Sequence, residues 1–384
     1  MTARTAAFAL LLGNFVIGLS IIGPAGMIDP LAADFGISVA RAAVLITFGA
    51  IVLCIGSPLV AWGVATFDRR SLLAATMAAL SICHVASALA PSFALLLGVR
   101  LVEMAFAAVF TPQAASAIAM MVPERERPGA ISFVFLGWSL SAAAGMPAVA
   151  WVAAEHGWRS VHWALAGVAA LAAIGVLAST PRNLRGAAMS LASWSSLLRN
   201  PFVLTLLAAT ILAGVGQFVI FTFFAPLLAR TVMASPAEIA TCFAVFGVSG
   251  FVGNIVATRV VGRIGPLATS LIFFAALLTG ATIWALSGGS VTMALIASFV
   301  WGLGFAASNS MQQARLATAA PALAGGAIAL NSSSIYVGQA AGSAIGGALF
   351  DRGLFIVMGW TGVALLAVTL TLVLWSGRLE RTRG

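Results

Sequence analysis

Arg100 and Glu103 are the residues of this sequence best placed to do chemistry. They stand three residues apart, and so on one helix face, within the apolar run LLLGVRLVEMAFAAVFTPQAASAIAMM at 95–121. That run exceeds the roughly 20 apolar residues that cross a bilayer, and a charge at the bilayer centre costs at least about 2.5–3.5 kcal/mol. A carboxylate held beside a guanidinium in such a place can carry a proton. The alternative is a structural ion pair that locks the helices together.

The composition assigns the chain to the membrane. Hydrophobic residues make up 61% and charged residues 8% of the sequence, and the mean hydropathy is +1.09, whereas a soluble domain carries about 25% charged residues. The chain divides into about a dozen apolar blocks with short connections, which leaves no stretch for a soluble catalytic domain. No metal-ligand spacing, H-E-x-x-H or G-x-S-x-G motif occurs, so we expect neither an enzyme nor a bound cofactor.

All 19 basic residues are arginines, and their distribution suggests an orientation. If the N-terminus is cytoplasmic, most of them fall on the inner loops and helix ends. The predicted outer ends hold only Arg41, Arg159, Arg230 and Arg352. This is the positive-inside bias of membrane proteins, so the basic charge predicts two cytoplasmic termini rather than nucleic-acid binding.

We predict twelve spans in an all-α protein. They cover residues 6–28, 39–66, 71–90, 94–121, 129–153, 160–179, 201–229, 237–262, 266–287, 291–317, 323–349 and 354–376. The first block is longer than the 7–15-residue apolar core of a cleavable signal, so we interpret it as a span. The predicted units are a six-helix half at 1–180, a cytoplasmic linker with an amphipathic helix at 181–200, and a second six-helix half at 201–384.

The two halves look like copies of each other. Gly13-Asn14-Phe15-Val16-Ile17 recurs as Gly216-Gln217-Phe218-Val219-Ile220. Further short matches follow in the same order at gradually changing offsets: Phe48-Gly49 with Phe246-Gly247, Ala143-Ala144-Gly145 with Ala340-Ala341-Gly342, and Gly167-Val168-Ala169 with Gly362-Val363-Ala364. Six spans repeated in one orientation are typical of transporters whose halves rock about a site at the midplane.

Longer motifs support a family resemblance. They are Gly216-Gln217-Phe218-x-x-Phe221-Thr222-x-x-x-Pro226, Phe246-Gly247-x-x-Gly250-x-x-Gly253-Asn254 and Gly157-Trp158-Arg159. With them the chain resembles the major facilitator superfamily and, within it, the twelve-span drug:proton antiporter group, nearest to its sugar-, nucleoside- and chloramphenicol-efflux branch. The resemblance implies two pseudo-symmetric six-helix halves, in a monomer that exchanges a small-molecule substrate for protons by alternating access.

One signature of that superfamily occurs in altered form between spans 2 and 3. Asp68-Arg69-Arg70 keeps its paired basic residues, but Ala65 stands where its aspartate belongs. The resemblance implies a latch for the conformational change at this loop, in which Asp68 partly substitutes for the missing aspartate.

Two more signatures lie within spans. The R-x-x-Q-G signature of span 4 becomes R-L-V-E-M, which puts Glu103 at the glutamine position. The antiporter signature of span 5 is retained around Gly145-Met146-Pro147, which implies that Gly145 and Pro147 take part in the conformational change.

The resemblance also implies that spans 1, 4, 7 and 10 line a central cavity. The substrate contacts expected there are Asn14, Phe15, Phe106, Gln217, Phe221, Thr222, Ser308 and Asn309, with Tyr336 and Gln339 from span 11. Neutral hydrogen-bonding groups among aromatic rings favour an uncharged polar or amphipathic compound, because a phosphate or dicarboxylate would need several arginines or lysines. For each polar residue the alternative is an interhelical hydrogen bond, and for each phenylalanine it is packing.

The other polar groups receive simpler interpretations. We interpret His84 as a hydrogen-bonded packing residue of its span, with a place in a proton path as the alternative. We interpret His162 as interfacial, Asp29 and Asp34 as solvated loop carboxylates, and Cys54, Cys83 and Cys242 as small buried hydrophobes.

The sequence thus predicts a proton-coupled antiporter that exports a small neutral or amphipathic compound. Glu103 would carry the proton, and Arg100 would stabilise its charged form. The alternative within the same fold is a uniporter, an importer or a proton symporter in which the two residues form only a structural pair. A membrane-embedded enzyme lacks its motifs here, a channel suits the repeated halves less well than alternating access does, and a non-transporting receptor remains open.

Overall fold

The chain folds into a bundle of long helices. The computed structural model describes residues 3–64, 66–185 and 191–381, and every regular element in these ranges is helical. The first half contains α1 (Ala3–Ile22), the 3-10 turn η1 (Gly23–Gly26), α2 (Ile28–Phe35), α3 (Val39–Gly63), α4 (Arg69–Ala88), α5 (Phe93–Met121), η2 (Glu124–Glu126), α6 (Arg127–Leu140), the π-helix η3 (Ser141–Gly145), α7 (Met146–His156) and α8 (Trp158–Ser179). After it comes α9 (Leu191–Leu198), where the amphipathic linker helix is expected; residues 186–190 of that linker lie outside the described ranges.

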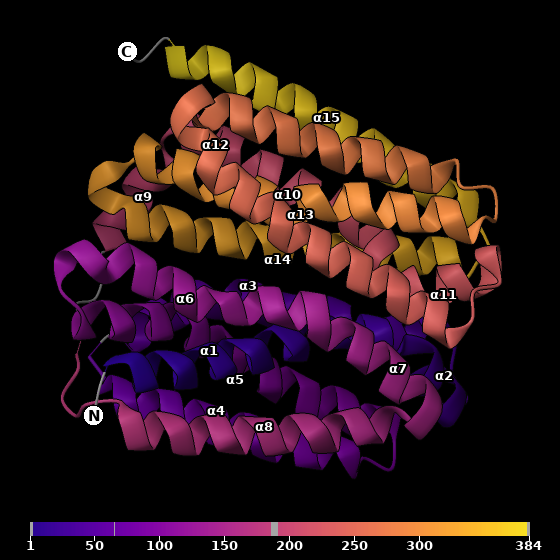
Figure 1. The fold of residues 1–384 in the computed structure, drawn as a ribbon, viewed down its shortest axis with the longest axis horizontal. Helices are drawn as coiled ribbons and strands as arrows, with labels where there is room; N and C mark the ends of the chain where they lie inside the picture. Colours follow the sequence, from indigo (N-terminus) through magenta and orange to yellow (C-terminus); the bar gives the residue numbers. More distant parts are fainter. Residues whose placement is uncertain (1–2, 65, 186–190, 382–384) are drawn as a thin grey trace.

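The second half repeats this plan. It contains α10 (Pro201–Phe221), α11 (Phe224–Leu227), the π-helix η4 (Leu228–Val232), α12 (Pro236–Ala285), α13 (Val291–Ala319), η5 (Pro321–Leu323), α14 (Ala324–Phe350) and α15 (Phe355–Arg381). Figure 1 shows the helices of the first half below those of the second, with both termini and α9 at one end and α2 and α11 at the other. We call these the α9 end and the α2 end.

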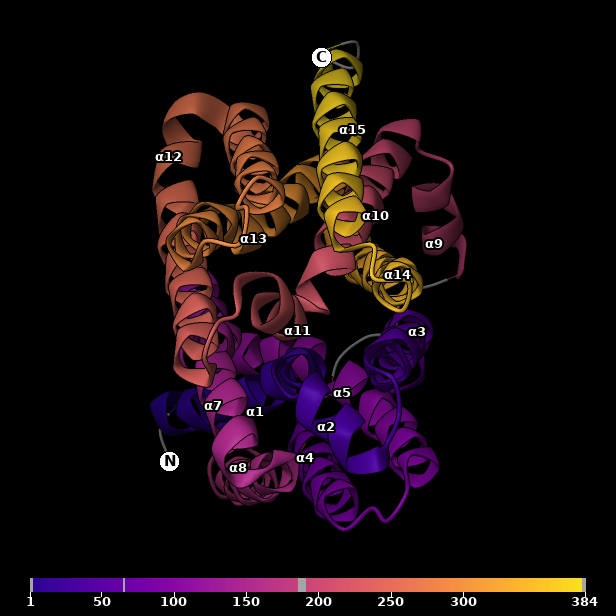
Figure 2. The same ribbon diagram turned by 90° about the vertical axis from the view of Figure 1, so that its right-hand side faces the viewer.

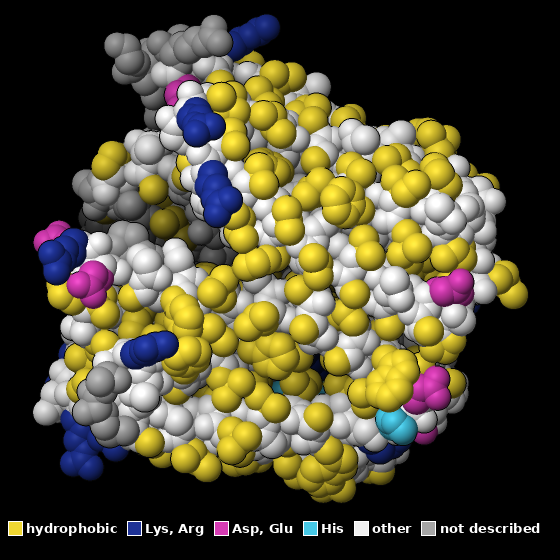
Figure 3. Space-filling view, in the orientation of Figure 1, with side chains coloured by type: hydrophobic (Ala, Val, Ile, Leu, Met, Phe, Trp, Pro, Cys, Tyr) yellow, Lys and Arg dark blue, Asp and Glu magenta, His cyan; other side chains and the backbone are white. Residues whose placement is uncertain are grey.

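The twelve predicted spans are present in this order. Ten described helices are long and apolar enough to cross a membrane. One of them, α12, contains two spans, because Gly265 leaves the helical conformation at φ 82° and Pro266 follows it. The remaining span is α14, whose serines, glycines and Asn331 lower its hydropathy below that of the ten. Figure 3 shows hydrophobic side chains across the middle of one face and most charged side chains toward its ends, as expected for a surface that contacts lipid.

Glycines set the spacing of helices inside each half. A Cβ on Gly338, Gly342 or Gly346 of α14 would lie 2.6 Å from a backbone carbonyl oxygen of α10. In the first half, a Cβ on Gly137 of α6 would lie 2.2 Å from the carbonyl oxygen of Leu11 in α1. Such contacts between backbones are typical of membrane helices that associate through small residues. They hold α10 on α14 and α1 on α6 in the same way, as the internal repeat predicts.

The halves meet along two lines. One joins α3 to α14, and the other joins α12 to the broken fifth span formed by α6, η3 and α7; Figure 2 views these contacts along the bundle. The break follows from Pro147, which has no N–H to donate to the carbonyl of Ala143. The N–H of Met146 instead bonds to the carbonyl of Ser141, which makes a π-turn. Gly247 of α12 packs directly against this turn, since a Cβ there would lie 2.2 Å from the carbonyl oxygen of Ala142.

We therefore expect Gly247→Ala to destabilise the protein by about 1–3 kcal/mol, the usual cost of overpacking. Gly98→Ala in α5 is the matched control, because nothing lies within 4 Å of the added carbon, and an exposed helical Gly→Ala change stabilises slightly. Thermal unfolding of both variants in detergent measures the difference. Equal stabilities would show that the contact between α12 and η3 relaxes at no cost.

Candidate functional site

Arg100 is buried at the point where three helices of the first half meet. Its guanidinium donates to the carbonyl of Ser20, to the carbonyl of Ile21 at 3.2 Å and to the carbonyl of Leu45 at 3.4 Å. The Ser20 carbonyl is available because Pro24, four residues on, has no N–H to offer it. Gly49 makes room on α3, since a Cβ there would lie 3.3 Å from Nε of Arg100. Arg100 therefore ties α5 to the end of α1 and to α3.

Glu103 lies beside Arg100 and has no solvent exposure. Its Oε2 is 3.3 Å from Nη1 of Arg100, and its Oε1 is 3.5 Å from Nε2 of His84. No hydrogen bond reaches Oε1. The expected pairing of Arg100 with Glu103 is thus present, and one carboxylate oxygen remains without a hydrogen-bond donor.

Two histidines, His84 and His162, belong to this cluster. His84 is 1% exposed; its Nε2 lies 2.9 Å from Oγ of Ser20, and its Nδ1 lies 3.1 Å from Nδ1 of His162. The interfacial interpretation of His162 is wrong, because its side of α8 packs on α4 and leaves it only 6% exposed. Residues so far apart in sequence carry no spacing that would reveal the pair. Among the described residues, no group of three or more histidine, cysteine, aspartate or glutamate side chains could hold a metal ion.

Asp29 and Asp34, at the α2 end, are partly exposed, as expected for solvated carboxylates, and each also forms an ion pair that was not predicted. Asp29 lies 2.9 Å from Nη2 of Arg230, and this pair joins α2 of the first half to η4 of the second. Asp34 lies 2.5 Å from Nη1 of Arg159 and also accepts from the indole of Trp158 at 3.2 Å, wholly within the first half. The hydrogen bond from Arg159 holds the pKa of Asp34 below its usual value. The stabilisation from this second pair is therefore complete above the ordinary aspartate pKa and is lost as pH falls through the lowered value.

These two pairs give a matched test of the closure at the α2 end. Asp29→Asn removes a link between the halves, so we expect it to increase the exposure of this end, whereas Asp34→Asn leaves the link intact. Exposed pairs contribute about 1 kcal/mol or less, enough for up to about a fivefold population change. Distance distributions between spin labels placed on α2 and η4 measure that change. A shift that is the same in both variants would contradict the role of Asp29.

One predicted substrate contact, Asn14, forms hydrogen bonds between helices of the first half. Asn14 is fully buried; its amide donates to the carbonyl of Val134 at 3.1 Å, and it accepts from the hydroxyl of Thr111 at 2.8 Å. The indole of Trp138 donates in turn to Thr111 at 3.3 Å. Asn14 thus binds α1 to α5 and α6. Thr111 and Trp138 were not predicted, and the internal repeat gives no signal for them.

The second half uses its polar residues in the same manner. Thr222 and Ser343 share a hydrogen bond of 2.7 Å between the seventh span and α14. Asn309 accepts from the amide of Asn331 at 2.8 Å, and Ser308 donates to a carbonyl of its own helix. Thr222 and Asn309 therefore form the interhelical hydrogen bonds that were the alternative to substrate contact.

The predicted aromatic contacts divide into two kinds. Phe221 is 2% exposed inside a cluster of rings from four helices, formed with Phe218, Phe224, Phe243, Phe246, Trp301 and Phe305. Its surroundings are those of a packing residue. Phe15 is half-buried and Phe106 is 38% exposed, so both present surface to their surroundings.

Gln217, Tyr336 and Gln339 complete the predicted set. The amide of Gln217 donates to the carbonyl of Ala213 at 3.2 Å, but its Oε1 is buried without a hydrogen-bond partner. Tyr336 is half-buried, and Gln339 is 2% exposed. Among the predicted polar contacts, Gln217 therefore has a buried oxygen that accepts no hydrogen bond.

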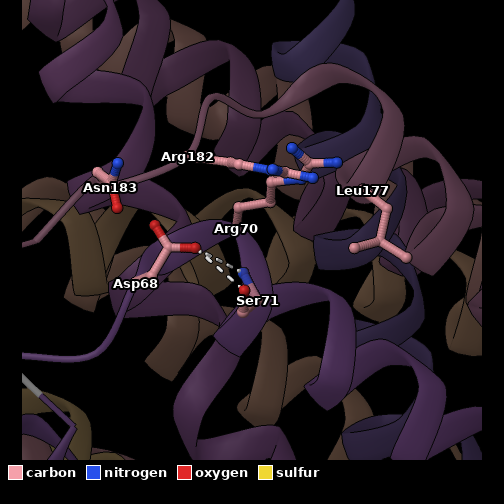
Figure 4. Close-up of a pocket in the computed structure, with 6 residues that line it drawn as sticks. All are labelled: Asp68, Arg70, Ser71, Leu177, Arg182 and Asn183. Atoms are coloured by element: carbon pink, nitrogen blue, oxygen red, sulfur yellow. Dashed lines mark hydrogen bonds between the residues drawn. The ribbon is translucent and has the colours of Figure 1, made fainter.

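The loop between α3 and α4 is anchored within the first half. Asp68 begins α4 by accepting from the N–H and hydroxyl of Ser71, and it also accepts from the N–H of Leu184 at 3.0 Å. Arg69 donates to two carbonyls of its own loop. Figure 4 shows Arg70 beside Arg182 over a shallow hollow that Asp68 and Ser71 also line. The contacts of Asp68 do not cross to the second half, and the latch at Asp68, Arg69 and Arg70 stays a prediction.

Comparison with known proteins agrees with this architecture. A family model described as Major Facilitator Superfamily matches residues 10–343 and again 206–383. The inner membrane transport protein YdhP of Escherichia coli O157:H7 is 27% identical over 97% of this chain and 96% of its own length. A chloramphenicol resistance protein of Streptomyces lividans is 30% identical over 83% of this chain and 82% of its own. A crystal structure of a D-xylose–proton symporter superposes with a TM-score of 0.75 over 96% of this chain and 97% of its own, at 18% identity.

Proposed function

The chain belongs to the major facilitator superfamily of transporters, and we propose that it is a proton-coupled antiporter that exports a small uncharged or amphipathic compound. The observation that carries the proposal is Glu103. It is a carboxylate without solvent exposure, paired with Arg100 on one side and open to a histidine on the other. A membrane protein retains such a group at considerable energetic cost, which is typical of proton carriers.

The substrate class rests on the groups that remain unused by the fold. Gln217 offers a buried carbonyl oxygen without a partner, and Tyr336, Phe15 and Phe106 present polar and aromatic surface. None of these carries a charge. They suit an uncharged compound with hydroxyl or amide groups, the chemistry that chloramphenicol and sugars share. Arg100 is occupied by backbone carbonyls and Glu103, so it is unsuited to bind an anionic substrate.

The Asp29–Arg230 ion pair supports an assignment of the side of the membrane to which this conformation is closed. Asp29 and Arg230 join the halves there, and the arginine distribution favours a cytoplasmic location for the α9 end. The conformation is then closed toward the outside, the state that would receive a compound from the cytoplasm. Outward opening requires the Asp29–Arg230 pair to separate.

A second candidate function has its own support. Because Arg100 bonds to carbonyls of α1 and α3 as well as to Glu103, the two residues resemble a structural tie. In that case the protein is a uniporter or a proton symporter of the same fold.

Flux in everted membrane vesicles separates these functions. With chloramphenicol and a series of sugars and nucleosides as probes, an antiporter accumulates its substrate when the vesicle lumen is acidic, and a protonophore abolishes the accumulation. A uniporter equilibrates the compound regardless of the gradient. A symporter expels it from an acidic lumen, and either result would replace the antiporter proposal.

A further inference from the structure

Glu103 has no direct access to water. It is fully buried, and the imidazole of His84, which can pass on a proton, lies 3.5 Å from its unpaired Oε1. A proton can therefore reach Glu103 through His84 in this conformation without separation of the helices.

His162 continues this line toward the α2 end. Its Nδ1 lies 3.1 Å from Nδ1 of His84, and the two ring centroids are 5.3 Å apart. It lies one helical turn, about 6 Å, from Trp158 at the start of α8, and the two rings meet edge to face. The indole N–H of Trp158 bonds to Asp34, which is half exposed on the α2 face. His162 and His84 thus lie between the start of α8, at that face, and the carboxylate.

We propose that His162 and His84 form a proton relay between the α2 face and Glu103. The relay rests on the proposed role of Glu103 as the proton carrier. It adds to that role the side of the protein, the α2 face, from which Glu103 receives its proton while the two halves remain closed at the α2 end.

The proton balance follows from the two imidazole tautomers. At the start His162 holds its proton on Nδ1, His84 holds its proton on Nε2, and Glu103 is ionised. A proton binds Nε2 of His162 from the α2 face, the Nδ1 proton of His162 moves to Nδ1 of His84, and the Nε2 proton of His84 moves to Oε1 of Glu103. Both rings are neutral before and after, and one proton has been transferred. Reorientation of the rings restores the start after Glu103 releases its proton toward the α9 end.

Other polar groups around the pair favour this stepwise exchange. Arg100 and Glu103 face it from α5, Ser20 from α1, and Cys83 stands beside His84 on α4. At the start of α8, Arg159 is neutralised by Asp34. The fixed charge of Arg100 opposes a lasting second cation at His84, so the imidazolium that forms as the proton passes gives its proton on to Glu103 and both rings return to neutral. The hydroxyl oxygen of Ser20 lies 2.9 Å from the same Nε2 of His84 and can remain hydrogen-bonded to the ring as it begins to reorient.

The test follows Glu103 directly and requires no substrate. In vesicles that expose the α2 end, acidification of that side should produce the infrared carboxylic-acid C=O band that Glu103→Gln removes. We expect His84→Phe and His162→Phe to slow the appearance of this band by about 100-fold, which is in the lower part of the range of rate effects for positioned proton-transfer groups. The control is His156→Phe at the same end of the protein, which should match the unsubstituted rate, because His156 is exposed and outside the relay.

The outcomes distinguish the relay from the carrier. An unchanged rate in both histidine variants would overturn the relay and leave Glu103 as a carrier loaded by another route. The absence of any pH-dependent band that depends on Glu103 would overturn the proposed function itself, and the relay with it.

A second measurement covers the case in which the histidine variants do not fold. The chain has three histidines, so His156→Phe identifies the two relay rings in the ¹⁵N spectrum. Their preceding residues, Cys83 and Val161, distinguish His84 from His162 by selective ¹³C labelling. Glu103→Gln imitates the protonated carrier, and we expect it to move the His84 proton from Nε2 to Nδ1. The same His84 tautomer in both proteins would overturn the relay.

Discussion

Glu103→Gln is expected to reduce gradient-driven accumulation in everted vesicles to the level of vesicles without the protein. The amide is close in shape to the carboxyl group and still accepts from Arg100, but it cannot take up and release a proton at physiological pH. Binding and exchange of unlabelled for labelled substrate should persist, because neither step requires net proton movement. Both are measured with chloramphenicol or the first compound that the vesicle assay identifies.

The matched control for this change is Glu155→Gln, an exposed carboxylate at the end of α7. It should leave accumulation unchanged. Full accumulation in Glu103→Gln would show that Glu103 only neutralises Arg100, and the structural-tie alternative would then replace the antiporter. Loss of exchange together with accumulation would instead indicate that the substitution damages the fold.

Arg100→Met is expected to produce the largest loss of stability. The substitution leaves Glu103 buried beside no cation and removes the donor from carbonyls of α1 and α3. Breaking a buried pair by removing one partner costs about 3–5 kcal/mol. Denaturant-induced unfolding in detergent micelles measures this cost through the shift in the unfolding midpoint.

The double substitution Arg100→Met with Glu103→Leu separates the charge from the hydrogen bonds. It should recover part of the loss, because no unpaired charge remains, while the Ser20 and Ile21 carbonyls still lack a donor. Arg159→Met provides the surface comparison, with a cost of about 1 kcal/mol or less. A double variant less stable than Arg100→Met would contradict this account.

The sequence was sufficient for the fold because one physical requirement dominates it. Backbone groups in lipid must be satisfied within a helix, so each apolar block of bilayer length predicts a span. Spans 8 and 9 were separated correctly at Gly265-Pro266 even though the helix α12 runs through both. The Arg100–Glu103 pairing was equally predictable, since a three-residue spacing places both side chains on one helix face.

The sequence did not predict the groups that complete the site, because their contacts depend on how whole helices rotate against each other. His84 and His162 stand on α4 and α8, and nothing local indicates that both face inward. Asn14 and Thr222 were expected to contact substrate or to form an interhelical hydrogen bond, and each is hydrogen-bonded to a neighbouring helix. A polar residue in a span signals an inward face, and only the helix packing shows whether its partner is a ligand or another helix.

The π-turn in the fifth span has a consequence for the movement of the halves. At Gly247 the two halves touch through backbone atoms alone, since any side chain there would collide with the carbonyl of Ala142. At this one contact, no side chain of Gly247 has to change its rotamer when the halves move. The junction is a contact between two backbones, which one proline in the first half and one glycine in the second make possible. We therefore expect the resistance to rocking to come from the ion pair at the α2 end rather than from the middle of the bundle.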